Sequence, residues 1–309
     1  MQLVSVMRIA PYQNIFFKEG FFRIGRANIV EKGRQKNFLM FFFVVDSVQE
    51  APNFIALVPN TLISLIFVFM WAVFKKDLRQ FFSSLTGYIA MIVFLLVNGL
   101  FLFVFPETSI FNFGYATLDK FFELAPWIFL LLIPAITMRS FSDEFRTGTF
   151  EILQTKPVSK WEIVNGKYLA CLVVIVFALL PTAIYIVSVQ QLSEQNGIDI
   201  GATAGSYGGL FFLAAVFASI GLCCSSFSNN AVVSFMAAAF LCFVMYNAFG
   251  ALSLLPVFAS GADYYLEMIG IDFHYHSLSR GVIDSRDIVY FLSLIGLFLM
   301  LTKRNLAEG

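Results

Sequence analysis

Met138–Lys167, MRSFSDEFRTGTFEILQTKPVSKWEIVNGK, lies between two long apolar runs and decides the fold. This stretch holds nine Asp, Glu, Lys and Arg residues, whereas the cores of the apolar runs on either side hold none. An apolar run of about 20 residues is long enough to cross a bilayer as a helix. A charged segment between two such runs predicts a loop on one membrane face, and its helical pattern predicts a docking surface.

The composition is that of an integral membrane protein. Hydrophobic residues make up 59% of the 309 residues, charged residues make up 13%, and the mean hydropathy is +0.81. A soluble domain of this size would expose too few charged side chains to stay dissolved. The 20 basic and 20 acidic residues leave no basic surplus to neutralise phosphates, so we expect no nucleic-acid partner.

Six apolar segments approach the length of a membrane-spanning helix. They are Thr86–Phe105, Phe121–Met138, Tyr168–Val189, Leu210–Phe227, Ala231–Leu255 and Ile288–Leu301. The last is short, and the long side chains of Lys303 and Arg304 can extend it to the interface. The segments are continuously apolar rather than alternating, which excludes barrel strands. The predicted fold class is therefore all-α, an integral membrane protein with six transmembrane helices.

Basic residues in the predicted loops set the orientation. Ten lie on one side of the membrane and three on the other. The larger group is Lys75, Lys76, Arg79, Arg139, Arg146, Lys156, Lys160, Lys167, Lys303 and Arg304, and the smaller is Lys120, Arg280 and Arg286. Because cytoplasmic loops carry the excess of Lys and Arg, both termini and the charged stretch are predicted to be cytoplasmic.

Residues 1–69 fit this scheme poorly. They are slightly basic and lack a sustained period, and Phe54–Phe74 by its length could form a seventh span. Such a span would place the seven Lys and Arg residues of the first 36 outside, against the charge trend. The first thirty residues do not read as a secretory signal. We interpret residues 1–69 as an N-terminal extension, with Met70 as an alternative start or the segment as a dispensable tail, and residues 70–309 as the membrane domain.

From Met70 to Leu85, apolar residues recur at helical spacing and charged or amide side chains fill the other face. This pattern predicts an amphipathic helix that lies in the cytoplasmic interface before the first span. The residues that characterise it are Trp71, Phe74, Lys75, Lys76, Arg79 and Phe82. A plain membrane anchor and a specific contact surface are both consistent with the pattern.

The charged stretch has the pattern of a helix, a break and a second helix. The predicted inner face of its first helix comprises Phe141, Phe145, Thr149 and Ile152. Pro157 ends that helix, and Ser159 with Glu162 forms a capping-box pattern that starts the next one. The chain is thus predicted to leave the second span as a helix, break once and re-enter the membrane. The alternative is a solvated charged loop.

The sequence offers no set of residues for catalysis or nucleotide binding. The six span cores lack the ionisable residues that proton relays and ion-coupled carriers use. The pair Gly166–Lys167 is a near miss for a phosphate loop, because Trp161 replaces the first Gly and Tyr168 replaces the Ser or Thr. We therefore expect no catalytic residue and no cofactor.

Three further features have ordinary explanations. Asp272, His274 and His276 are too few for a convincing metal site, and we expect no metal. The four cysteines lie in predicted spans, where buried thiols are expected. A set of four glycines, Gly201, Gly205, Gly208 and Gly209, predicts a flexible outer loop.

The pattern F-x-x-E-x-R-x-G-T-x-E-x-L-x-T-x-P-x-S-x-x-E-I-V-x-G-K from Phe141 to Lys167 resembles the junction of the second and third spans in type-2 ABC exporter permeases. The resemblance extends from Met70 to the C-terminus. Four blocks resemble, in addition, the gliding-motility-associated permeases of Bacteroidetes. They are FFSSLTGYIA (81–90), NGLFLFVFPET (98–108), FFELAPWIFLLLIPAITMRSF (121–141) and KYLA (167–170).

The resemblance implies a permease subunit, not an enzyme, in the bacterial inner membrane. It implies a cytoplasmic coupling helix between spans two and three that seats an ABC ATPase supplied in trans, with the interfacial helix as a brace. The coupling residues it implies are Phe141, Glu144, Arg146, Gly148, Thr149, Glu151, Pro157, Glu162, Gly166 and Lys167. Further implied partners are a second membrane subunit or a second copy, and membrane lipid. The last outer loop is expected to re-enter the membrane.

The expected function is the coupling of that ATPase to transport, or to force transmission, for gliding motility. Two alternatives are an exporter of lipids or drugs unrelated to gliding, and a membrane scaffold that transports nothing.

Overall fold

The computed structural model describes residues 8–9, 13–17, 20–31, 34–40, 54–106, 117–156, 158–193, 198–255 and 262–308. The chain divides into two compact units, Met1–Leu62 and Ile63–Gly309.

The first unit contains four antiparallel strands. They are β1 (Arg8–Ile9), β2 (Gln13–Phe17), β3 (Gly20–Glu31) and β4 (Arg34–Met40). Strand β3 pairs with β2 along residues 20–24 and with β4 along residues 25–31. The sequence analysis predicts no regular element here. The strand sequences do not alternate polar and apolar residues, as in β4, RQKNFLM, so no two-residue period identifies them.

The described part of the second unit is helical, in agreement with the predicted fold class. Its longer helices are α1 (Phe54–Ser83, which begins in the first unit), α2 (Leu85–Phe103), α3 (Asp119–Thr137), α6 (Lys160–Leu179), α7 (Ala183–Leu192), α8 (Ile200–Ser226), α9 (Ala231–Phe243) and α13 (Ser285–Glu308). Shorter elements are α4 (Ser142–Thr147), α5 (Thr149–Gln154), η2 (Leu180–Thr182), η3 (Val244–Ala248), α10 (Phe249–Ser253), α11 (Ala262–Glu267) and α12 (Ile271–Leu278).

The predicted spans all fall within these helices. In the described residues, the runs that begin with α3, α6, α8 and α9, and the helix α13, are each long and apolar enough to cross a membrane. The first predicted span corresponds to α2, and the break between Phe69–Ser83 and Gly87–Phe103 bends the chain by 68°. Helix α13 continues past Leu301 to Glu308, so the last span is extended through its basic residues as predicted.

The predicted interfacial helix is the second half of α1. Ser84 has extended backbone angles, φ −93° and ψ 128°, and separates α1 from α2. A Cβ atom at Gly87 would lie 2.8 Å from the ring of Phe81, so the glycine lets the two helices meet at a sharp elbow. Helix α1 begins at Phe54, so the apolar segment Phe54–Phe74 and the predicted interfacial residues belong to one continuous helix.

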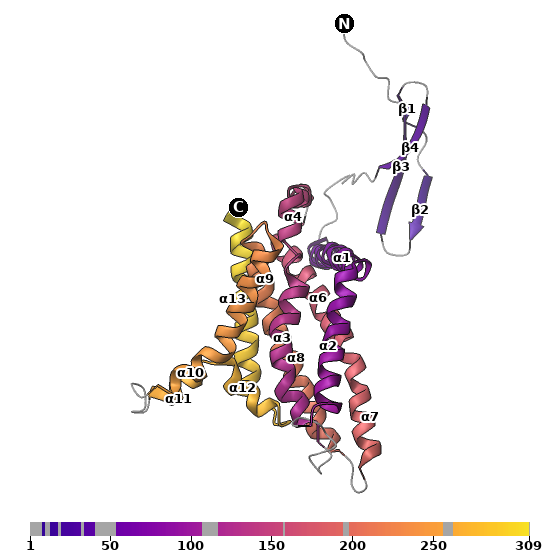
Figure 1. The fold of residues 1–309 in the computed structure, drawn as a ribbon. Coiled ribbons are helices and arrows are strands. Elements are labelled where there is room, and N and C mark those ends of the chain that lie inside the picture. The colour runs from indigo at the N-terminus through magenta and orange to yellow at the C-terminus, as the bar shows by residue number, and fades with distance from the viewer. Residues whose placement is uncertain are drawn as a thin grey trace. The chain divides into compact units, whose positions relative to one another are not determined.

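Helix α8 is the most enclosed helix of the bundle. It packs against α3, α6, α9, α12 and α13 (Figure 1). The prediction of a flexible glycine loop was wrong, because Gly201, Gly205, Gly208 and Gly209 belong to this helix. A Cβ at Gly205 would lie 2.7 Å from the carbonyl of Gly281, and one at Gly209 would lie 2.5 Å from Leu278. These glycines therefore allow close packing of the outer loop on α8.

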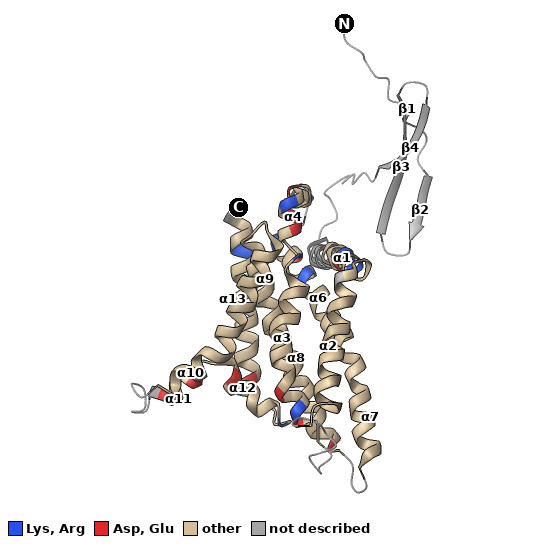
Figure 2. Ribbon diagram, viewed as in Figure 1, with Lys and Arg blue, Asp and Glu red and all other residues tan. Residues whose placement is uncertain are grey.

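The two ends of the bundle consist of different elements. Helices α4 and α1 and the C-terminus lie at one end, and α11, α12 and the end of α7 lie at the other (Figure 1). Charged residues, blue and red on the ribbon, gather at both ends, and the middle of the bundle is almost free of them in this view (Figure 2). This arrangement matches the predicted alternation of spans and loops.

Candidate functional site

The segment between α3 and α6, residues 138–159, is called the hinge below. It contains a turn at residues 138–141, then α4, then α5. The prediction of a single helix up to Pro157 was wrong. Gly148, with φ +69° and ψ 7°, ends α4 in the left-handed conformation that glycine adopts at helix ends, and α5 starts immediately after it. Pro157 itself lies outside the described residues.

The break at Gly148 changes which hinge residues face inward. Phe141 and Phe150 are buried, and Phe150 packs edge-on against the ring of Phe145 with centroids 4.9 Å apart. Thr149 and Ile152, predicted to continue the inner face, are exposed, Ile152 by 63%. The left-handed backbone at Gly148 rotates α5 relative to α4. A helical period counted from Phe141 to Ile152 as if they formed one helix therefore assigns residues of α5 to the wrong face.

A serine of α8 anchors the start of α4. The Ser225 hydroxyl accepts hydrogen bonds from the backbone nitrogens of Phe141 (3.0 Å) and Ser142 (3.2 Å). It also donates to the Met138 carbonyl at 3.1 Å. Backbone N–H groups in the first turn of a helix lack partners within the helix, so Ser225 supplies a cap from another helix.

The predicted capping box at the start of α6 is confirmed. The Glu162 backbone nitrogen donates to the Ser159 hydroxyl at 3.3 Å, and the Ser159 nitrogen donates to Glu162 Oε2 at 3.1 Å. Glu162 is buried and its carboxylate is committed to this cap. Its place in the structure is thus at the helix start, where it fixes the direction in which the chain re-enters the bundle.

Lys167 is the centre of a buried ion-pair cluster. Its side chain is 1% exposed, and its ammonium group donates to Asp77 Oδ2 of α1 at 3.0 Å and to the Ser140 carbonyl at 2.7 Å. Glu144 Oε1 of α4 lies 3.0 Å from the same nitrogen. These contacts use all three ammonium protons. The Phe141 ring lies 4.9 Å from the nitrogen and adds a cation–π contact.

Glu144 belongs to the same cluster. Its side chain is 6% exposed, and Oε1 also pairs with the ammonium group of Lys76. Burial alone raises the pKa of this carboxyl, but the nearby Lys167 and Lys76 outweigh burial, so the pKa lies below its ordinary value. The carboxylate is therefore ionised at neutral pH. Its second oxygen, Oε2, has no hydrogen-bond partner among the described residues.

The interfacial helix packs onto α6 at the cluster. Phe74 is buried, and Phe82 meets Phe177 of α6 edge-on at 5.5 Å. Trp71 is 45% exposed, and Lys75 lies over its ring at 5.5 Å. Lys75, Lys76 and Arg79 are exposed along the other side of the helix. This division between a packed side and a basic side is the one that the amphipathic pattern predicts.

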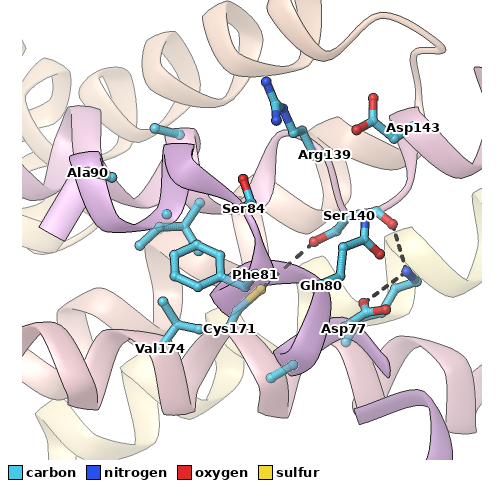
Figure 3. Close-up of a pocket in the computed structure, with 15 residues that line it drawn as sticks. Asp77, Gln80, Phe81, Ser84, Ala90, Arg139, Ser140, Asp143, Cys171 and Val174 are labelled. Carbon is cyan, nitrogen blue, oxygen red and sulfur yellow. Dashed lines mark hydrogen bonds and ion pairs between the residues drawn. The ribbon is translucent and has the colours of Figure 1, made fainter. Parts of the chain in front are cut away.

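A pocket of about 110 Å³ lies beside the cluster, between α1, α2, α3 and α6. Figure 3 shows Asp77, Gln80, Ser140 and Asp143 along its polar side and Phe81 on its apolar side. A dashed line in the same view joins the Ser140 hydroxyl to the Cys171 sulfur, which are 4.0 Å apart. The elbow thus covers a small mixed pocket rather than filling the space completely.

The remaining coupling candidates lie on the outside of the hinge. Arg146 is 68% exposed and pairs with Asp143 of its own helix at 3.2 Å. Gly148, Thr149 and Glu151 are exposed beside it. Of the ten predicted residues, Pro157 lies outside the described residues and Glu162 belongs to the cap of α6. The other eight form an inner set at the cluster and an outer set that is accessible to another protein. The inner set is Phe141, Glu144, Gly166 and Lys167, and the outer set is Arg146, Gly148, Thr149 and Glu151.

Three residues that make contacts at this site are not among those predicted from the sequence. Asp77, Ser140 and Ser225 complete the cluster and the cap, yet none of them belongs to a recognisable motif. Asp77 offers a weak signal, as the one acidic residue among the basic residues of the interfacial helix. Ser140 contributes a backbone carbonyl to Lys167, so no sequence pattern identifies it.

The candidate metal ligands of the outer loop do not converge. His274 is buried, with Nδ1 2.7 Å from Asp287 Oδ1 and Nε2 2.9 Å from the Met268 carbonyl. Asp272 and His276 are exposed. No group of three metal-binding side chains occurs within the part of the chain that the structure describes. The histidine instead ties α12 to the start of α13.

Comparison with known proteins places the whole membrane unit in one family. The model of the ABC-2 family transporter proteins matches residues 71–300, which is most of the chain. A search of curated proteins found no match. The matched residues include the interfacial part of α1, the hinge and the helices α2 to α12. The chain therefore belongs to the ABC-2 transporter family, and it is a membrane permease subunit of an ABC transporter.

Proposed function

We propose that this permease couples a separate ATPase, supplied in trans, to movement of its helices in the bacterial inner membrane. In this proposal the ATPase docks on the outer set of hinge residues, Arg146, Gly148, Thr149 and Glu151. The inner set around Lys167 passes the movement to the bundle. The chain acts as the membrane partner of this ATPase.

The Lys167 cluster is the observation that supports this proposal best. One ammonium group joins Asp77 of α1, Glu144 of α4 and its own helix α6 through contacts of 3.0 Å. A buried ion pair adds little net stability compared with apolar packing, but removing one partner is costly. Three elements linked in this way move together, which is what transmission from a docked ATPase requires.

The proposed orientation places the hinge and the C-terminus in the cytoplasm. The excess of basic residues on the hinge side supports it. An ATPase in the cytoplasm reaches the hinge only in this orientation. The N-terminal residues 1–69 are proposed to be an extension that the permease does not need.

The proposed cellular role is gliding motility. The four sequence blocks that resemble gliding-motility-associated permeases support it, and the two longest, residues 98–108 and 121–141, lie in or beside the first two spans.

We further propose that the functional unit contains two membrane subunits. Exposed apolar side chains on α2 and α9, such as Ile92, Leu96, Met236 and Phe240, suit contact with lipid or a second subunit.

The test is the purified complex of the permease with the ATPase encoded beside it. We expect the two to co-purify, and we expect ATP hydrolysis to change when inner-membrane lipids are added. Lys167→Met should uncouple hydrolysis from the lipid response. An ATPase that never associates with the permease would leave the scaffold alternative in place, and a deletion strain that still glides would remove the motility role.

A further inference from the structure

A groove of about 510 Å³ lies on the hinge side of the bundle, between the two hinge helices, the link from α8 to α9 and the end of α13. Its aromatic wall comes from Phe145 and Phe150 of the hinge. The opposite wall comes from Phe227 and from Asn305 near the C-terminus. The groove therefore brings together segments that are far apart in the sequence.

The charged residues that line this groove are both acidic. Glu144 and Glu151 are its only charged lining residues among the described ones, and no Lys or Arg lines it. Glu151 is exposed and forms no ion pair with another described residue. Glu144 is already paired with Lys76 and Lys167, so Glu151 is the carboxylate of this lining that is open to a positively charged occupant.

Glu144 provides a second and independent indication. Its Oε1 already pairs with two lysines, but Oε2 is buried and has no partner in the described structure. Nearly all buried polar atoms in folded proteins have a hydrogen-bond partner, so an unsatisfied carboxylate oxygen beside a groove points to a missing donor. No described residue supplies that donor.

The lining distinguishes a guanidinium group from an ammonium group. Phe145, which is half-buried and lines the groove, offers aromatic surface on which a planar cation can stack. The acceptors are spread over several elements, since Glu144 and Glu151 belong to α4 and α5 and the amides of Gln154 and Asn229 lie farther along the lining. Arginine has five N–H donors in a fixed plane and suits several acceptors at once, whereas an ammonium group is a point charge.

We propose that this groove receives an arginine side chain of the partner ATPase, held between Glu151 and Glu144 on the aromatic wall. The inference rests on the proposed function, because it needs an ATPase docked on the hinge. It assigns the charge and the residue type that the docking surface of that ATPase must present.

The test uses the complex of the full-length permease with the ATPase encoded beside it. Glu151→Lys should lower the affinity for the ATPase by about tenfold or more, because mismatched charge pairs at interfaces cost about 2–5 kcal/mol. Glu151→Gln should give a smaller loss. The control is Thr155→Lys, which also places a lysine on the exposed surface, one helical turn after Glu151, but does not line the groove. This control should bind the ATPase within about twofold of the unmodified permease.

A photo-cross-linking amino acid at Gln154 then identifies the occupant. We expect the captured ATPase peptide to contain an arginine, and its replacement by glutamate should restore binding to the Glu151→Lys permease. Equal binding by both lysine variants, equal loss in both, a captured peptide without arginine, or capture of the permease itself would each overturn the inference. If the unmodified permease retains no ATPase, the proposed function has failed instead.

Discussion

Gly166 of α6 lies directly against the backbone carbonyl of Met70 in α1. A Cβ atom at position 166 would lie 2.9 Å from that oxygen and 3.1 Å from the Val73 side chain. The absence of a side chain thus sets how closely the interfacial helix approaches α6. It also explains, in structural terms, why a glycine precedes Lys167.

The substitution Gly166→Ala should push α1 away from α6 and weaken the Lys167–Asp77 pair. We expect a loss of about 1–3 kcal/mol, the usual cost of forcing a methyl group into a packed contact. The melting temperature of the detergent-purified protein measures it. Gly208→Ala is the matched control, because no atom lies within 4 Å of a Cβ there, and alanine should be neutral or slightly stabilising. Equal melting temperatures for both variants would contradict the packing argument.

The substitution Lys167→Met should destabilise the protein by about 3–5 kcal/mol, since it leaves two buried carboxylates without their shared cation. The triple variant with Asp77→Asn and Glu144→Gln should regain much of that loss, because the repelling charges are then gone. Thermal unfolding of the three proteins tests this order. A triple variant less stable than Lys167→Met alone would show that the cluster is not held by charge.

The structure predicts different outcomes for Glu144, which is buried, and Arg146, which is exposed. Glu144→Lys places a third ammonium group beside Lys76 and Lys167 and should lower the melting temperature strongly. Arg146→Glu breaks only an exposed pair with Asp143, which is worth about 0.5 kcal/mol or less. We expect Arg146→Glu to fold normally and to reduce ATPase co-purification. The opposite ranking of stabilities would contradict the assignment of inner and outer sets.

Reporter fusions test the orientation. Fusions after Leu85, Lys160 and Lys303 should be cytoplasmic, and fusions at Asn112, Asn196 and Asp272 should be periplasmic. The expectation follows from the basic residues on the hinge side. A periplasmic signal at Lys160 would place the hinge beyond the reach of any cytoplasmic ATPase.

A chain that starts at Met70 should insert and complement a deletion strain fully. It keeps the Met70 carbonyl that meets Gly166, and it keeps Phe74 and Asp77, through which α1 contacts the bundle. Complementation of motility and the melting temperature of the purified protein are the two measurements. Loss of activity in a stable truncated protein would assign a function to residues 1–69.

Much of the bundle follows from the sequence because spans depend on long apolar runs, which local composition reveals. The capping box is also local, since Ser159 and Glu162 are three residues apart. The break at Gly148 is different. Glycine is compatible with many positions, and its left-handed conformation here depends on how Phe145 and Phe150 pack after the turn. The pattern alone therefore cannot assign the inner face of α5.

The ion-pair cluster depends on contacts across long sequence separations. Lys167 meets Asp77 from 90 positions earlier, and Phe141 meets Ser225 from 84 positions later. No periodicity relates such residues. The glycines of α8 were predicted as a loop for a similar reason, since glycine usually weakens a helix and its packing role appears only when Leu278 and Gly281 are in place.

Because Ser225 anchors the hinge, α8 links the hinge to the opposite end of the bundle. With 27 residues and no proline, this helix is roughly 40 Å long. One end holds the hinge through the Ser225 hydroxyl, and the other end meets the outer loop at Gly205 and Gly209. We therefore expect a displacement that pulls on Phe141 to reach the outer loop as a movement of the whole helix. Distances between spin labels on α8 and α12, measured in the complex with the ATPase, with and without ATP, would show this movement directly.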